Sequence, residues 1–166
     1  MSKIQGGNLM LFIGGNSIAY ATNHTLEISG ETKDTSNKDE GGGSWKSEEV
    51  GILSWSATSE NLFCDEGAGK TYADLFDLMV AKTPIAAVFS LRNEADSVTN
   101  VPTNGWTPKV PKYTGNVVIT SLSLNAPNGE YATFTANFSG VGALTKVTSD
   151  PDPDDNGGGG NNGEGE

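Results

Sequence analysis

The sequence predicts a mainly β domain with one helix, folded as an antiparallel β-sandwich or barrel with long inter-strand loops. Three observations predict this class. Apolar and polar residues alternate with a period of two in most apolar segments, as in strands with one covered and one wetter face. One segment has helical spacing instead. Asn128 and Gly129 separate two strand-like segments, as a hairpin turn would.

Three strands are predicted in the first half of the chain. The first is the apolar run Leu9–Ile13, which ends at two glycines. The second covers residues 17–29, and the third covers residues 51–62. In each, the larger residues share one face of a sheet. Those of the second are Ile18, Tyr20, Thr22, His24, Leu26 and Ile28, and those of the third are Leu53, Trp55 and Ala57.

A single helix is predicted over residues 72–81. Thr71 precedes it and Asp74 follows three residues later, a variant of the capping box, while Pro84 lies just past its end. We interpret its apolar stripe as the face that packs on the sheet. The stripe consists of Tyr72, Leu75, Phe76, Met79 and Val80.

Three more strands are predicted after the helix, over residues 85–91, 116–125 and 130–138. The last two are joined by the Asn128-Gly129 turn, whose residues tolerate the positive φ that such turns need. In the final strand the predicted inward residues are Ala132, Phe134, Ala136 and Phe138.

Two long polar segments are predicted as loops, residues 31–49 and 93–115. The first contains Trp45 among nine charged residues and three consecutive glycines, and the second contains Trp106 among prolines. Loops of this length are uncommon in compact domains and are usually functional or disordered. Because tryptophan is enriched at protein contacts, we expect each indole to meet a partner. The alternative is that each folds back over its own sheet edge.

Charge divides the chain into a domain over residues 1–148 and an acidic tail over residues 149–166. The chain has 10 Lys and Arg against 21 Asp and Glu, a net charge of −11. Six of the acidic residues and no basic residue lie in the tail, which has no apolar residue beyond its prolines. We expect the tail to be disordered and to keep the protein soluble. A partner-binding peptide is the alternative.

The composition argues against catalysis, cofactors, metals and nucleic-acid readout. With one Cys, one His and one Arg, the chain has no disulfide framework, no Cys/His zinc site and no basic patch for phosphates. His24 is interpreted as a satisfied structural or interface residue, and Cys64 as a small buried hydrophobe. Gly69-Lys70-Thr71 resembles the end of a phosphate-binding loop, but Cys64 stands where the pattern needs glycine. We therefore predict no catalytic residue, no cofactor and no metal.

No signal peptide or membrane span is expected, because the apolar run near the N-terminus has only five residues. We therefore expect the protein to begin its life in a cytosol, without a membrane anchor.

Four stretches and their order resemble the major tail tube proteins of long-tailed bacteriophages and prophages. These stretches are LEISGETKDTSNKD at 26–39, GILSWS at 51–56, VITSLSLN at 118–125 and FTANFSG at 134–140. The resemblance covers residues 8–147 and rests on the order and spacing of the stretches. It implies the fold of the phage tail tube type and a structural protein of the virion tail, not an enzyme.

The resemblance also implies an assembly. Copies would join into hexameric rings whose sheets complete an inner β-barrel, and the rings would stack into a tube through which DNA passes without specific binding. Other tail proteins, such as the tape measure, the terminator and the baseplate or tip, would be partners. Assembly would occur in the cytoplasm of a bacterial host. The long loop of this family reaches a neighbour, which places Lys38, Asp39 and Trp45 at inter-subunit contacts, with Trp106 as a further candidate.

Two alternatives stay open. The protein could form the inner tube of a contractile injection machine, with the same fold and ring assembly. It could instead be a β-sandwich module that binds carbohydrate or peptide through Trp45 and Trp106.

Overall fold

The computed structural model describes residues 3–39, 45–93, 101–102 and 105–150. Seven strands and one α-helix follow each other along these residues, after a short 3-10 turn at Gly6–Asn8. They are β1 (Leu9–Ile13), β2 (Asn16–Ser17), β3 (Ala21–Asp34), β4 (Glu48–Leu62), α1 (Tyr72–Ala81), β5 (Ile85–Arg92), β6 (Pro108–Asn125) and β7 (Thr133–Val147). All but two residues of the predicted acidic tail lie outside the described residues.

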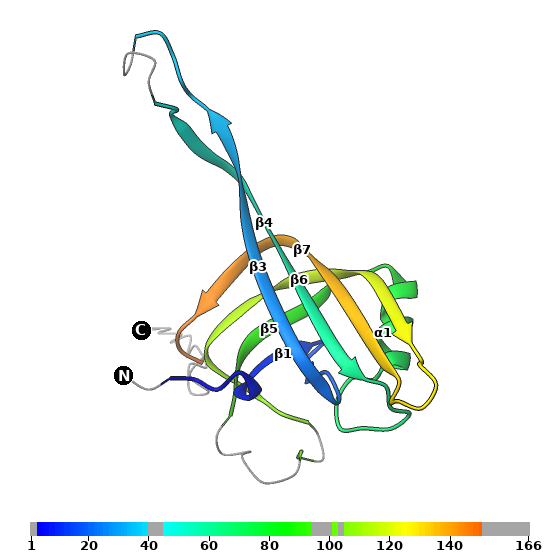
Figure 1. The fold of residues 1–166 in the computed structure, drawn as a ribbon. Helices are drawn as coiled ribbons and strands as arrows, with labels where there is room; N and C mark the ends of the chain where they lie inside the picture. Colours follow the sequence, from blue (N-terminus) through cyan, green and yellow to red (C-terminus); the bar gives the residue numbers. More distant parts are fainter. Residues whose placement is uncertain (1–2, 40–44, 94–100, 103–104, 151–166) are drawn as a thin grey trace, which may run out of the picture.

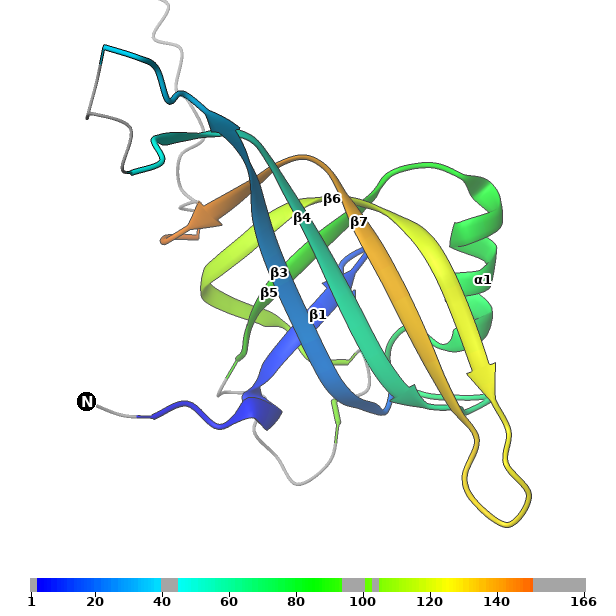
Figure 2. The same cartoon turned by 45° about the horizontal axis from the view of Figure 1, so that its top comes forward.

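The strands form one antiparallel sheet in the order β2-β1-β5-β6-β7-β4-β3. The sheet curls strongly, so that β3 and β4 lie in front of β1 and β5 in both views (Figures 1 and 2). β1 and β3 approach each other across this curl without a ladder between them in the described chain. The mainly β class with one helix is confirmed, as a single curled sheet.

Most predicted strands are present, but several extend further than predicted. β3 continues to Asp34 and β4 begins at Glu48, so the predicted loop 31–49 shrinks to residues 35–47. Similarly, β6 begins at Pro108, well inside the predicted loop 93–115. These added segments are polar or contain proline, so they lack the apolar alternation by which strands are recognised.

The prolines of β6 lie where its ladders are interrupted. The pairing with β5 shifts register between Ser90 and Arg92, and the pairing with β7 begins only at Lys112. Pro111 therefore removes no hydrogen bond from a continuous ladder, which is the position where strands tolerate proline.

The short strand β2 was not predicted, and it explains Gly69-Lys70. Lys70 N–H donates to Ser17 O and Ala19 N–H donates to Lys70 O, both at 2.8 Å. A Cβ on Gly69 would lie 2.4 Å from Ser17 O, and its φ is +125°. The glycine is needed for this close approach of two backbones, rather than for a phosphate.

α1 begins and ends as predicted, but only part of its stripe packs on the sheet. Asp74 Oδ2 accepts hydrogen bonds from the Thr71 N–H at 2.9 Å and the Thr71 hydroxyl at 3.1 Å. Leu75 is fully buried, whereas Phe76 and Val80 are 52% and 60% exposed. The prediction that these last two pack inward was wrong. The partly buried helix residues that touch the core are Tyr72, Leu78 and Met79, because the helix lies on a face rotated from the predicted one.

The core lies between the curled sheet and α1. Its largest buried side chains include Phe134 and Phe138 of β7, which were predicted to face inward, together with Leu11, Ile13, Leu75 and Val117. Tyr20 was predicted on the covered face of the second strand, but it is 59% exposed. It lies just before β3, with a φ of +51° that breaks the period-two alternation.

Trp55 joins three strands at one end of this core. Its indole lies over the backbone of β6 at Gly115 and of β7 at Gly140, where added Cβ atoms would lie 2.5 and 2.3 Å from ring atoms. Its Nε1–H donates to Gly142 O at 3.0 Å. The indole ring therefore fills the space that side chains at these two glycine positions would need.

We predict that Gly140→Ala will lower the free energy of unfolding by about 1–3 kcal/mol, the usual cost of overpacking. Chemical denaturation measures it. Gly7→Ala is the matched control, because an added Cβ there meets nothing within 4 Å. In a Trp55→Ala background most of the Gly140→Ala cost should disappear, and an unchanged cost there would contradict the steric explanation.

Candidate functional site

The β3–β4 hairpin forms an arm that projects from the body of the molecule (Figure 1). The ladder continues outward from Ile28↔Trp55 to Asp34↔Glu48, with a register shift between Gly30 and Thr32. β3 forms a ladder with β4 alone in the described chain, so from the root outward the arm is a two-stranded ribbon. Such a ribbon has no buried face of its own.

Side-chain hydrogen bonds hold the arm together near its tip. Thr35 N–H donates to Ser47 O at 2.9 Å, and Ser47 N–H donates to the Ser36 hydroxyl at 3.0 Å. Ser36 lowers the pKa of the exposed Asp34 carboxyl, first through its side-chain hydrogen bond and then through its N–H, which donates to Asp34 Oδ1 at 2.9 Å. Lys46 forms an ion pair with Glu48. The polar residues of the predicted loop thus close a hairpin.

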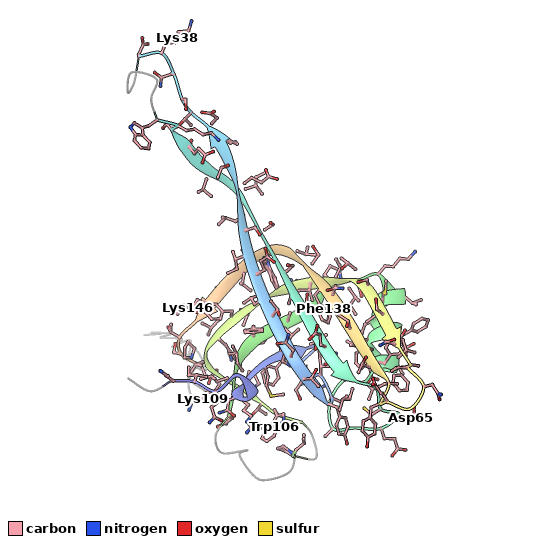
Figure 3. All side chains as sticks on the ribbon, viewed as in Figure 1. Lys38, Asp65, Trp106, Lys109, Phe138 and Lys146 are labelled. Atoms are coloured by element: carbon pink, nitrogen blue, oxygen red, sulfur yellow. The ribbon has the colours of Figure 1, made fainter. Side chains whose placement is uncertain are left out.

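The structure places the three loop residues predicted at contacts together at the far end of this arm. Lys38 lies at the tip, away from the body (Figure 3). Asp39 follows it, with its N–H bonded to Asn37 Oδ1 at 3.0 Å. Trp45 is 90% exposed, far more than a tryptophan with a partner in its own chain. The alternative that Trp45 folds back over its own sheet is not what the structure has.

One face of the arm is apolar and continuous with the core face of the sheet. Ile28, Val50 and Leu53 lie on that face and are about 60% exposed, at 58%, 61% and 67%. Gly30 lies between them, and a Cβ there would lie 2.8 Å from Val50 and 3.2 Å from Leu53. The absence of a side chain at Gly30 lets the two apolar side chains close over the backbone. We name Ile28, Val50 and Leu53 the arm strip.

A groove of about 530 Å³ opens at the root of the arm strip. Trp55 forms part of its lining, and Lys146 is the charged residue in it. Its other larger lining residues are Ile28, Leu53, Tyr113 and Leu144. The sequence analysis missed this root groove. Its residues come from β3, β4, β6 and β7, and the period-two signal of Ile28, Leu53 and Trp55 does not show which strands meet there.

A second feature is the seam between β1 and the free edge of β3. A cavity of about 320 Å³ lies there, lined by Leu9 and Met10 on one side and by Ala21 and His24 on the other. Within the described chain, neither ring nitrogen of His24 has a hydrogen-bond partner, although both are buried. Burial lowers the pKa of His24 from 6.5 to about 4. The prediction of a histidine satisfied within its own structure is therefore wrong for the described part of the chain, while its alternative, an interface histidine, stays a prediction.

The structure places Trp106, the fourth candidate, against the body rather than in solvent. It is 7% exposed, and the Arg92 guanidinium carbon lies 4.1 Å from its ring centroid, a cation–π contact. The chain's one arginine thus packs on an indole at the end of β5. This position matches the alternative in which the indole folds over its own sheet edge.

The described ranges hold no metal-binding cluster, and the one cysteine is not activated. No group of three or more His, Cys, Asp or Glu side chains there could hold a metal ion. Burial and the neighbouring Asp65 raise the pKa of the Cys64 thiol, which opposes thiolate formation. None of the helices in the described part of the chain is long and apolar enough to cross a membrane.

Comparison with protein families gives one match that spans most of the sheet and the arm. The family model described as phage tail tube protein matches residues 14–146. No curated protein matches the chain.

Solved structures of similar fold come from several tail-like particles. A chain in the virion of a native gene transfer agent particle has a TM-score of 0.66 at 17% identity, over 88% of this chain and 100% of that one. A chain from the sheath/tube terminator of the extracellular contractile injection system PVC gives 0.62 at 16% identity, over 89% and 99%. The SPP1 tail tube gives 0.60 at 11% identity, over 89% and 80%.

We predict that His24 makes the folded chain less stable as the pH falls from 6.5 to 4, the interval between its pKa values in the unfolded and folded states. Unfolding takes up a proton in this interval, so stability declines by up to about 1.4 kcal/mol per pH unit. His24→Leu should remove this slope. The free energies of unfolding of both chains at several pH values measure it, and parallel pH profiles would contradict it. The carboxylates are common to both chains, so their effects cancel in the difference.

Proposed function

Because this chain belongs to the phage tail tube protein family, we propose that its copies join into hexameric rings that stack into a tube for genome delivery. The family is structural, and the chain is accordingly a tail tube component of a phage or phage-like particle. The match over residues 14–146 carries this proposal, because it includes both the curled sheet and the arm.

The free edge of β3 supports the ring. β3 is fourteen residues long, and twelve of them pair with β4, so in the described chain this strand has a ladder on one side only. An open strand edge favours pairing with another chain, and natural proteins usually block it. A contact between this edge and a different surface of the next copy is heterologous, and such contacts close into rings when the rotation between copies permits.

The sixfold symmetry is proposed by similarity. A chain in the tail of the empty gene transfer agent particle, described with C6 symmetry, has a TM-score of 0.66 to this chain. Net charge is compatible with a conduit, since a chain of −11 repels the phosphates of DNA and lets the polymer pass without binding.

The arm supports contact between copies beyond a single ring edge. It carries Lys38 away from the body (Figure 3), and Asp39 and Trp45, at the same end of the arm, are exposed where a neighbouring subunit can reach them. We propose these three as contact residues. Trp106 is proposed as a contact residue only through the small part of its side chain that stays accessible, since it is 7% exposed. Assembly is proposed to take place in the host cytoplasm, with terminator, tape-measure and baseplate or tip proteins as further partners.

The inner tube of a contractile injection machine is a second candidate. Similar chains occur in the PVC sheath–tube complex and in the baseplate of the anti-feeding prophage. That candidate shares the ring assembly but differs in cargo. The carbohydrate-binding alternative is less supported, because Trp45 is the only one of the three tryptophans that is exposed.

We expect the purified, concentrated protein to form rings or hollow filaments with a regular axial repeat. Negative-stain electron microscopy and sedimentation measure this. A chain that stays monomeric at every concentration would contradict self-assembly of the chain alone, and binding to a glycan array would then favour the carbohydrate-binding module.

We expect deletion of residues 150–166 to leave assembly intact and to accelerate it a few-fold, because it removes six acidic residues per subunit. Light scattering at low and high salt measures the rate, and screening should shrink the difference at high salt. Lys112 forms a 2.8 Å ion pair with Asp150, so a second truncation that keeps Asp150 separates that contact from the tail. Loss of assembly in both truncations would show that the tail has a structural role.

A further inference from the structure

We propose that Trp45 at the arm tip of one copy inserts into the root groove of a second copy. This inference rests on the proposed function and adds to it the acceptor site for the arm. It joins two features that no other part of the described chain covers, an exposed indole and an open apolar groove.

The donor is an aromatic side chain presented on a stiff support. Trp45 is 90% exposed, beside a hairpin end held by the bonds between Ser36 and Ser47. A tryptophan contributes its large apolar area to binding only when a pocket covers it, and such residues dominate the energy of many interfaces.

The acceptor has the chemistry that an indole needs. The root groove measures about 530 Å³, and the larger side chains around it are Ile28, Leu53, Tyr113 and Leu144. Lys146 lines it and no carboxylate does. An ammonium beside an indole face adds a cation–π attraction to the apolar contact.

Charge favours the same pairing. Around the tip, the described arm residues 31–39 and 45–49 include five carboxylates against three lysines. Beside the groove, Lys146 lies opposite Tyr113 in the ladder. A net acidic arm would thus approach the ammonium group of Lys146, which promotes correct docking over other orientations.

The contact cannot form within one chain. Glu48 lies five positions from Leu53 along continuous β4, so the tip lies at least about 16 Å beyond the groove, at about 3.3 Å per strand residue. The ladder from Gly30↔Leu53 to Asp34↔Glu48 keeps the ribbon extended. Each copy therefore offers one indole and one groove to two different neighbours, a contact that repeats along an assembly.

Two variants and one control test this pairing. Trp45→Ala removes the indole, and Ala143→Trp fills the groove from an exposed position in its lining. Each should raise the critical concentration for assembly at least about tenfold in sedimentation assays. Tyr131→Ala removes an aromatic residue that is 86% exposed but distant from the arm, and should leave that concentration unchanged. Lys146→Glu is a second groove variant, in case Ala143→Trp fails to fold in a thermal melt.

An equimolar mixture of the Trp45→Ala and Ala143→Trp chains gives the sharper result. One chain has a groove without an indole and the other has an indole without a groove. We expect native mass spectrometry to find complexes of limited size with equal numbers of both, and no long tubes. Wild-type assembly accompanied by unchanged assembly of both variants would overturn this inference alone. A wild-type chain that never assembles would overturn the proposed function with it.

Discussion

The packing of Trp55 over two bare stretches of backbone is the constraint on which the rest of this structure depends. Gly115 and Gly140 leave room for the indole, and Gly142 O accepts its N–H. The indole ring thus links β4 to β6 and β7. Beyond this point the curled sheet no longer encloses its inner face. Inward of Trp55 the strands enclose a core, and outward of it β3 and β4 continue as a ribbon without a cover.

The exposed apolar surface follows from that arrangement. A two-stranded ribbon cannot bury either face, yet the core face of this one continues as Ile28, Val50 and Leu53 beyond the sheet. The root groove opens where this strip meets the ends of β6 and β7. Exposed apolar surface of this kind is costly in water, and the neighbouring copy that we propose would cover it.

Several unsatisfied features of the single chain agree with a protein built for assembly. The edge of β3 has unpaired backbone groups, and the buried ring of His24 has no partner within the described chain. Trp45 stands in solvent at the end of a projecting arm. The chain belongs to the phage tail tube protein family, and the assembly that we propose for it would give these features a common explanation.

The sequence by itself determined which segments have a covered face. Alternation located the main strands and the inward side chains of β7, while helical spacing and the Thr71–Asp74 pair located α1. Alternation of apolar and polar residues indicates only that one face of a strand is covered. It therefore could not predict the outer arm, where neither face is covered, or β2, which is held by backbone contacts. Tertiary structure alone decided that Phe76 and Val80 stay exposed, that Trp106 packs under Arg92, and that residues from four strands enclose the root groove. These outcomes depend on how the sheet curls and which strands meet, and no local pattern of residues records a contact between segments so far apart in the chain.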